Sequence, residues 1–143
     1  MLMFNPTREQ VRQFFFDAWR KYRAGQPLEG LETVAADVML LHPEHHHVLD
    51  DPARFLDADY SPDDGRMNPF LHMSLHVAVE EQLAIDQPPG IRAEFERLLA
   101  SRGDRHDALH ALLDCLGETV WRAQRERAVP DAETYLDCLR RQR

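Results

Sequence analysis

The stretch NPFLHMSLHVAVEEQLAID, residues 68–86, decides how the rest of the chain is interpreted. Asn68 followed by Pro69 is typical of a helix start, because an asparagine side chain caps free backbone N–H groups and proline fits the first turn. We therefore predict a helix over 68–86. His72 and His76 lie one turn apart on its apolar stripe, where both imidazoles can face one point. Buried imidazoles need polar partners, and a metal ion would supply one.

Further helices are predicted on both sides of this stretch, since β-branched residues are sparse and do not alternate with polar ones. The first begins at a cap, Asn5 or Thr7, and stops at Gly25, and the second covers 28–42. One or two short helical turns and then a loop follow in 43–65, then a helix from Ile91 up to SRGD at 101–104, a helix over 104–127 and a last helix from Pro130. The sequence predicts an all-α fold, a single helical bundle of five to seven helices that forms one domain, 1–143.

All eight histidines fall in three short stretches: HPEHHH at 42–47, His72 with His76, and His106 with His110. Short connections make successive helices antiparallel, so the helices over 68–86 and 104–127 should be parallel, with their N-terminal ends together. The helix over 28–42 should then deliver His42 to the same end of the bundle. This convergence predicts a metal site.

Each predicted ligand offers a ring nitrogen or a carboxylate oxygen, and such atoms suit a transition metal. The ion could be zinc or nickel in a mononuclear site, or iron in a dinuclear one. The predicted ligands are His42, His46, His72, His76, His106 and His110, with the carboxylates of Glu80 and Asp114. His45 and His47 are assigned to a solvated loop. The competing interpretation is that the histidines are core residues satisfied by backbone groups or carboxylates.

No reaction can be assigned from these motifs, so a metal-dependent enzyme stays open and its substrate is not predicted. HMSLH lacks the glutamate of the H-E-x-x-H metalloprotease motif, and HDALH offers the shorter Asp107 in its place. The alternative function is a metal-free protein–protein interaction module with an acidic surface. It is suggested by Phe14, Phe15 and Phe16, because three consecutive side chains on a helix cannot all face one core.

Composition limits the partners and the compartment. The chain has 143 residues, with 17 basic and 25 acidic side chains and a net charge of −8, which disfavours nucleic acid. It contains neither the roughly 18 apolar residues of a spanning helix nor a signal peptide, so we expect a cytoplasmic protein without membrane contact. Cys115 and Cys138 lie far apart and are expected to be reduced. A homo-oligomer is left open.

Four stretches carry a resemblance to a known family: FNPTREQVRQFFFDAWRK, HPEHH, NPFLHMSLHVAVEEQLAIDQPPGIR and HDALHALLDCLGE. Together they resemble the proteobacterial domain-of-unknown-function family numbered eighteen forty-one, over almost the entire chain. The resemblance implies a bacterial cytoplasmic protein and supplies no activity. The functional prediction therefore depends on the histidines.

Overall fold

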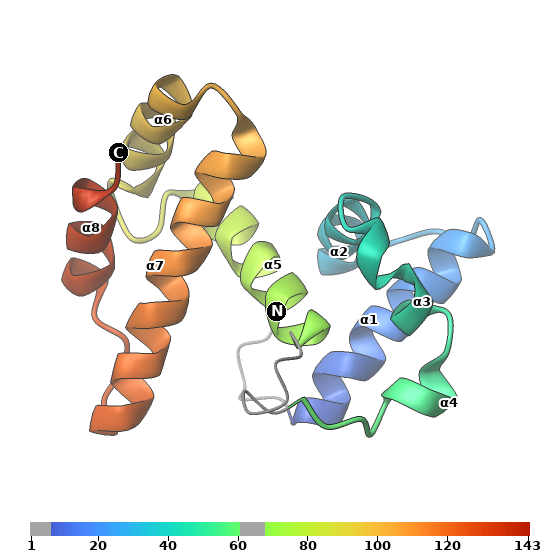
Figure 1. The fold of residues 1–143 in the computed structure, drawn as a ribbon. Coiled ribbons are helices and arrows are strands. Elements are labelled where there is room, and N and C mark those ends of the chain that lie inside the picture. The colour runs from blue at the N-terminus through green and yellow to red at the C-terminus, as the bar shows by residue number, and fades with distance from the viewer. Residues whose placement is uncertain (1–6, 61–67) are drawn as a thin grey trace. The chain divides into compact units, whose positions relative to one another are not determined.

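The computed structural model describes residues 7–60 and 68–143, and these residues form eight α-helices and one 3₁₀ turn, without a strand (Figure 1). The prediction of an all-α fold is confirmed. The eight helices are more than the predicted five to seven. The count includes α3 and α4, which have only four residues each. The chain divides into two compact units, Met1–Val77 and Ala78–Arg143, and the division falls within α5 (Pro69–Ile85). The single domain and the parallel helices stay predictions.

The first unit begins with α1 (Arg8–Arg23), whose start follows from a capping box. The Thr7 hydroxyl accepts from the backbone N–H of Gln10, and the Gln10 side chain accepts from the N–H of Thr7. Asn5, the other predicted cap, lies outside the described residues. Of the three consecutive phenylalanines, Phe15 and Phe16 are buried and Phe14 is only half-buried.

The remaining elements of the first unit are α2 (Leu31–Leu40), the 3₁₀ turn η1 (Pro43–His45), α3 (His46–Leu49), α4 (Pro52–Phe55) and the first turns of α5. α1 packs against α2 and α3. The start of α5 is capped as predicted, because Asn68 Oδ1 accepts from the backbone N–H groups of Phe70 and Leu71 at 3.0 and 3.1 Å. The apolar side chains of these elements, among them Trp19, Met39 and Met73, form one core.

A buried arginine, which the sequence did not single out, joins α1 to the segment after α4. Arg12 is 1% exposed, and its Nη1 donates to the carbonyl oxygens of Phe55, Leu56 and Ala58 at 3.1, 3.0 and 2.7 Å. Its guanidinium also lies over the ring of Phe70, 4.7 Å from the centroid. Burial lowers the pKa of this guanidinium below its usual value. Arg12 thus fixes a segment that has little regular structure of its own.

In the second unit, α7 (Arg105–Glu126) packs against α6 (Ile91–Arg102) and α8 (Ala132–Arg141) (Figure 1). Asp104 caps α7 as expected, by accepting from the N–H of Asp107. The last helix does not begin at Pro130, because the Asp131 carboxylate caps it by accepting from the N–H of Glu133.

The expectation of two reduced cysteines is wrong. Cys115 on α7 and Cys138 on α8 form a disulfide, with their Cα atoms 5.7 Å apart, although the two residues are 23 positions apart in the chain. Their wide spacing in sequence misled the prediction, since packing of α8 along α7 is what brings the two thiols together.

Among the described residues, every helix is too short or too polar to cross a membrane. The cytoplasmic location stays a prediction.

Candidate metal centre

The centre lies in the first unit and begins with His42, two residues beyond the end of α2. His42 is 1% exposed, and its ring Nδ1 lies 2.7 Å from the carbonyl oxygen of Val38. Because a carbonyl oxygen can only accept, Nδ1 carries the proton of the neutral ring. The other nitrogen, Nε2, then presents a lone pair, the tautomer that metal-binding histidines adopt when a backbone carbonyl holds their second nitrogen.

His72 and His76, one turn apart on α5, stand opposite His42. The ring centroid of His42 lies 4.8 Å from that of His72 and 4.4 Å from that of His76, and the last two are 4.9 Å apart. Each of the three rings offers a nitrogen, and these atoms lie within 4.8 Å of one another. The end of α2 and the first turns of α5 therefore bring three imidazoles to one point, as the sequence predicted for His42, His72 and His76.

A second group of possible ligands adjoins the first and shares His72 with it. Glu44, His45 and His72 also offer oxygen or nitrogen atoms within 4.8 Å of one another. The closest contact is between His45 Nε2 and His72 Nδ1, at 3.1 Å. Assigning His45 to a solvated loop was wrong, since this residue is 6% exposed and faces α5.

The 3₁₀ turn explains why His45 points inward. Pro43 begins η1, and in a 3₁₀ helix side chains three residues apart lie above one another. His42 and His45 consequently share a face, and their rings are stacked at 5.8 Å with an interplanar angle of 14°. Proline directly after His42 was the signal in the sequence that could have shown this, because it favours a new turn starting at residue 43.

The ionisation states of His45 and Glu44 favour the binding of a cation. Burial lowers the pKa of the His45 imidazole from 6.5, although the neighbouring Glu44 acts in the opposite direction. Burial disfavours ionisation of Glu44, yet a backbone hydrogen bond and the nearby His42, His45 and His72 outweigh it, so that the pKa of this carboxyl is lowered. At neutral pH the group thus combines a neutral imidazole with a carboxylate, the ionisation states in which both ligate metals.

The spacing of the ring nitrogens is close to what an ion requires. Two imidazole nitrogens bound tetrahedrally at roughly 2.0–2.1 Å from zinc lie about 3.3 Å apart. The nitrogens of His45 and His72 already lie at 3.1 Å. Other pairs in the two groups reach at most 4.8 Å, so side-chain movements of about 1 Å would complete the coordination geometry.

His46 and His47 do not belong to either group. His46 Nε2 lies 2.7 Å from the carbonyl oxygen of Met39, and its ring packs on Trp19 with the centroids 4.5 Å apart. The structure therefore gives His46, a predicted ligand, a packing contact in the core of the first unit. His47 is exposed, as predicted, and its ring makes an edge-to-face contact with Phe55, with the ring centroids 5.8 Å apart.

The remaining predicted ligands lie in the second unit. His106 and His110 are one turn apart on α7, with their ring centroids separated by 4.3 Å. Both carboxylate oxygens of Glu80 pair with the guanidinium of Arg105, at 2.9 and 3.3 Å, and Asp114 is exposed. That His106, His110, Glu80 and Asp114 bind the same ion as His72 and His76 stays a prediction.

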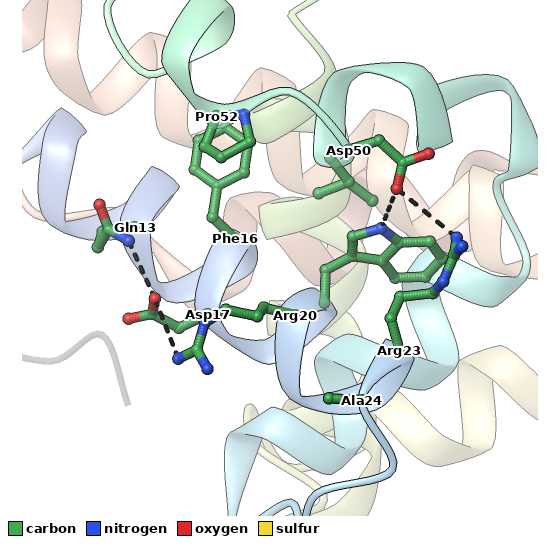
Figure 2. Close-up of a pocket in the computed structure, with 10 residues that line it drawn as sticks. Gln13, Phe16, Asp17, Arg20, Arg23, Ala24, Asp50 and Pro52 are labelled. Carbon is green, nitrogen blue, oxygen red and sulfur yellow. Dashed lines mark hydrogen bonds and ion pairs between the residues drawn. The ribbon is translucent and has the colours of Figure 1, made fainter.

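A cavity of about 530 Å³ in the first unit includes none of the predicted ligands. Figure 2 shows its lining, which includes Phe16 and other side chains of α1 together with Pro52 at the start of α4. The charged groups at its rim are paired, Asp17 with Arg20 at 3.8 Å and Asp50 with Arg23 at 3.6 Å. The grouped histidines are a stronger indication of chemistry than this cavity, because pairing already satisfies the charges at its rim.

A second cavity, of about 390 Å³, is lined by His45 and therefore adjoins the candidate ligands. Its other described walls come from α3, α4 and the segment that Arg12 holds, together with Pro69 at the start of α5.

Comparison with known proteins finds one family. The model of the family described as Domain of unknown function (DUF1841) matches residues 7–141. No curated protein and no solved structure matches the chain.

Proposed function

The chain belongs to the DUF1841 family, and we propose that it is a metal-binding protein whose histidine-rich site holds a transition-metal ion. The observation that carries the proposal is the grouping of His42, His72 and His76, whose ring nitrogens lie within 4.8 Å of one another although they come from two separate elements. The hydrogen bond from His42 Nδ1 to the Val38 carbonyl supports the same conclusion, because it leaves Nε2 as the ligating atom.

The donor set favours zinc, nickel or iron over magnesium or calcium. Imidazole nitrogens suit the transition metals, whereas the hard cations take oxygen ligands almost exclusively. Three protein ligands would leave a fourth position for water or a substrate, which is the composition of catalytic zinc sites. A fourth histidine from α7, as predicted from the sequence, would instead close the shell and favour a structural site.

The alternative interpretation is that these histidines only pack in the core and bind no metal ion. Neutral imidazoles can satisfy one another, as His45 and His72 do across 3.1 Å, without any ion. A metal-free core and a metal centre differ in their response to added ions, since only the second gains stability from a ligand that binds the folded chain.

The test is metal analysis of protein purified without a nickel column, followed by titration with zinc, nickel and ferrous iron. We expect at least about one ion per chain. His76→Ala should weaken zinc binding by more than about 100-fold, because even the loss of a residue that only holds a ligand in place costs roughly 10- to 100-fold. His47→Ala is the matched control, as an exposed histidine of the same unit outside both groups, and should bind like the wild type. Equal affinities for the two variants, or no uptake, would overturn the proposal.

His110→Ala then separates the open site from the closed one. If α7 supplies a fourth ligand, this variant should lose zinc affinity as His76→Ala does. If it binds zinc like His47→Ala, the ion has its protein ligands in the first unit alone, with a position left for a substrate.

A further inference from the structure

The cavity of about 390 Å³ shares His45 with the second ligand group. This volume is within the range of roughly 300–1,000 Å³ that is typical of small-molecule sites. Apolar walls come from Val48, Phe55 and Pro69, while Arg54 and Tyr60 add polar groups. A molecule in this space would have an apolar surface on one side and would lie next to an ion held by His45.

Arg54 lines this cavity with a positive charge and so favours a negatively charged ligand. Other basic side chains of the first unit are paired with carboxylates: Arg8 with Asp59, Lys21 with Glu32, Arg20 with Asp17 and Arg23 with Asp50. Arg12 is held by backbone carbonyls instead. Within the described part of the chain, no carboxylate pairs with the guanidinium of Arg54, which lies over the ring of Phe55 at 5.1 Å. An exposed arginine of this kind offers its planar donors to a carboxylate from outside.

We propose that this cavity binds a small organic acid, with its carboxylate between Arg54 and a metal ion held by Glu44, His45 and His72. The inference rests on the proposed function and extends it from the first ligand group to the second, which shares His72 with it. The apolar part of the acid packs on Val48 and Phe55, and the carboxylate oxygens satisfy the guanidinium and the open position of the ion. An uncharged molecule of the same shape lacks both of these contacts.

The test uses the full chain loaded with cobalt(II), whose visible spectrum reports on its ligands, and benzoate as the probe. We expect benzoate to change the cobalt spectrum and to bind about 10- to 100-fold more tightly than benzamide, its uncharged analogue. Arg54→Gln should weaken benzoate binding by a similar factor, while Arg23→Gln, an exposed arginine already paired with Asp50, should leave it unchanged. Circular dichroism checks that both variants fold.

The outcomes separate the two proposals. Failure to take up cobalt overturns the proposed function and this inference with it. Uptake of about one cobalt ion per chain, with no effect of benzoate on the spectrum, overturns the inference alone. Equal benzoate affinity in Arg54→Gln and the wild type, or equal binding of benzoate and benzamide, overturns it as well.

Discussion

His45 and His72, which are 27 residues apart in the chain, meet nitrogen to nitrogen, with His45 Nε2 3.1 Å from His72 Nδ1. A neutral imidazole has one donor and one acceptor, so one ring donates to the other. His72 is also the member that the two candidate ligand groups share. A change at His72 should therefore affect metal binding more than a change at any other single histidine of the first unit.

The first prediction concerns His72 and thermal stability. Saturating zinc, at a thousandfold excess over its Kd, should stabilise the wild-type chain by about 4 kcal/mol, equivalent to a rise in Tm of about 10 °C. His72→Ala should abolish most of this rise, because it removes a ligand from both groups. The measurement is thermal unfolding followed by circular dichroism, with and without a chelator.

His47→Ala is the control for this comparison, and it should keep the rise in full. The chelated wild type should still unfold cooperatively, since its buried apolar side chains form a core without the ion. A zinc-dependent rise that survives in His72→Ala would show that the metal binds elsewhere.

The second prediction concerns pH and His45. Burial lowers the pKa of this imidazole below 6.5, so the folded state prefers the neutral ring while the unfolded state takes up a proton more readily. The stabilising contribution is therefore complete above pH 6.5 and is lost as the pH falls through the lower pKa of the folded state. In the metal-free protein, the free energy of unfolding should decrease between about pH 7 and about pH 5.

Urea denaturation at a series of pH values provides the measurement. His45→Gln does not titrate in this range and should show a flatter dependence than the wild type. His47→Gln, with an exposed ring removed, should follow the wild type. Parallel curves for His45→Gln and the wild type would contradict the prediction.

The third prediction concerns the disulfide between Cys115 and Cys138. Closing a loop of 23 residues restricts the unfolded chain and should contribute about 3 kcal/mol to stability. Reduction with dithiothreitol should therefore lower the urea midpoint of the wild type. In the variant with both cysteines replaced by alanine, the same reagent should have no effect, and mass spectrometry of the alkylated protein should confirm the missing thiols.

The fourth prediction concerns Arg12. Arg12→Met removes a buried guanidinium and leaves the carbonyl oxygens of Phe55, Leu56 and Ala58 without this donor, which should cost about 3 kcal/mol of stability. Arg20→Met is the control on the same helix, because Arg20 is exposed and its pair with Asp17 at 3.8 Å should contribute less than about 1 kcal/mol. Chemical denaturation of both variants tests the difference, and equal losses would show that the carbonyl contacts of Arg12 add nothing.

The sequence by itself determined where three of the longer helices, α1, α5 and α7, begin. Thr7, Asn68 and Asp104 were identified as caps, and each accepts from a backbone N–H group two or three residues ahead. Such bonds depend only on neighbouring residues, so a local pattern suffices to predict them. The pairing of His72 with His76 was predictable for the same reason, because one turn of helix fixes it.

Tertiary structure alone decided the contacts between distant residues. His45 reaches His72 across 27 residues, Arg12 reaches the carbonyl of Ala58 across 46, and the disulfide spans 23. None of these contacts follows from helical periodicity, since each depends on how one element packs against another. Pro43 favours a turn within 42–47, but every other side chain there is polar or charged, so which of them faces α5 depends on how that turn packs.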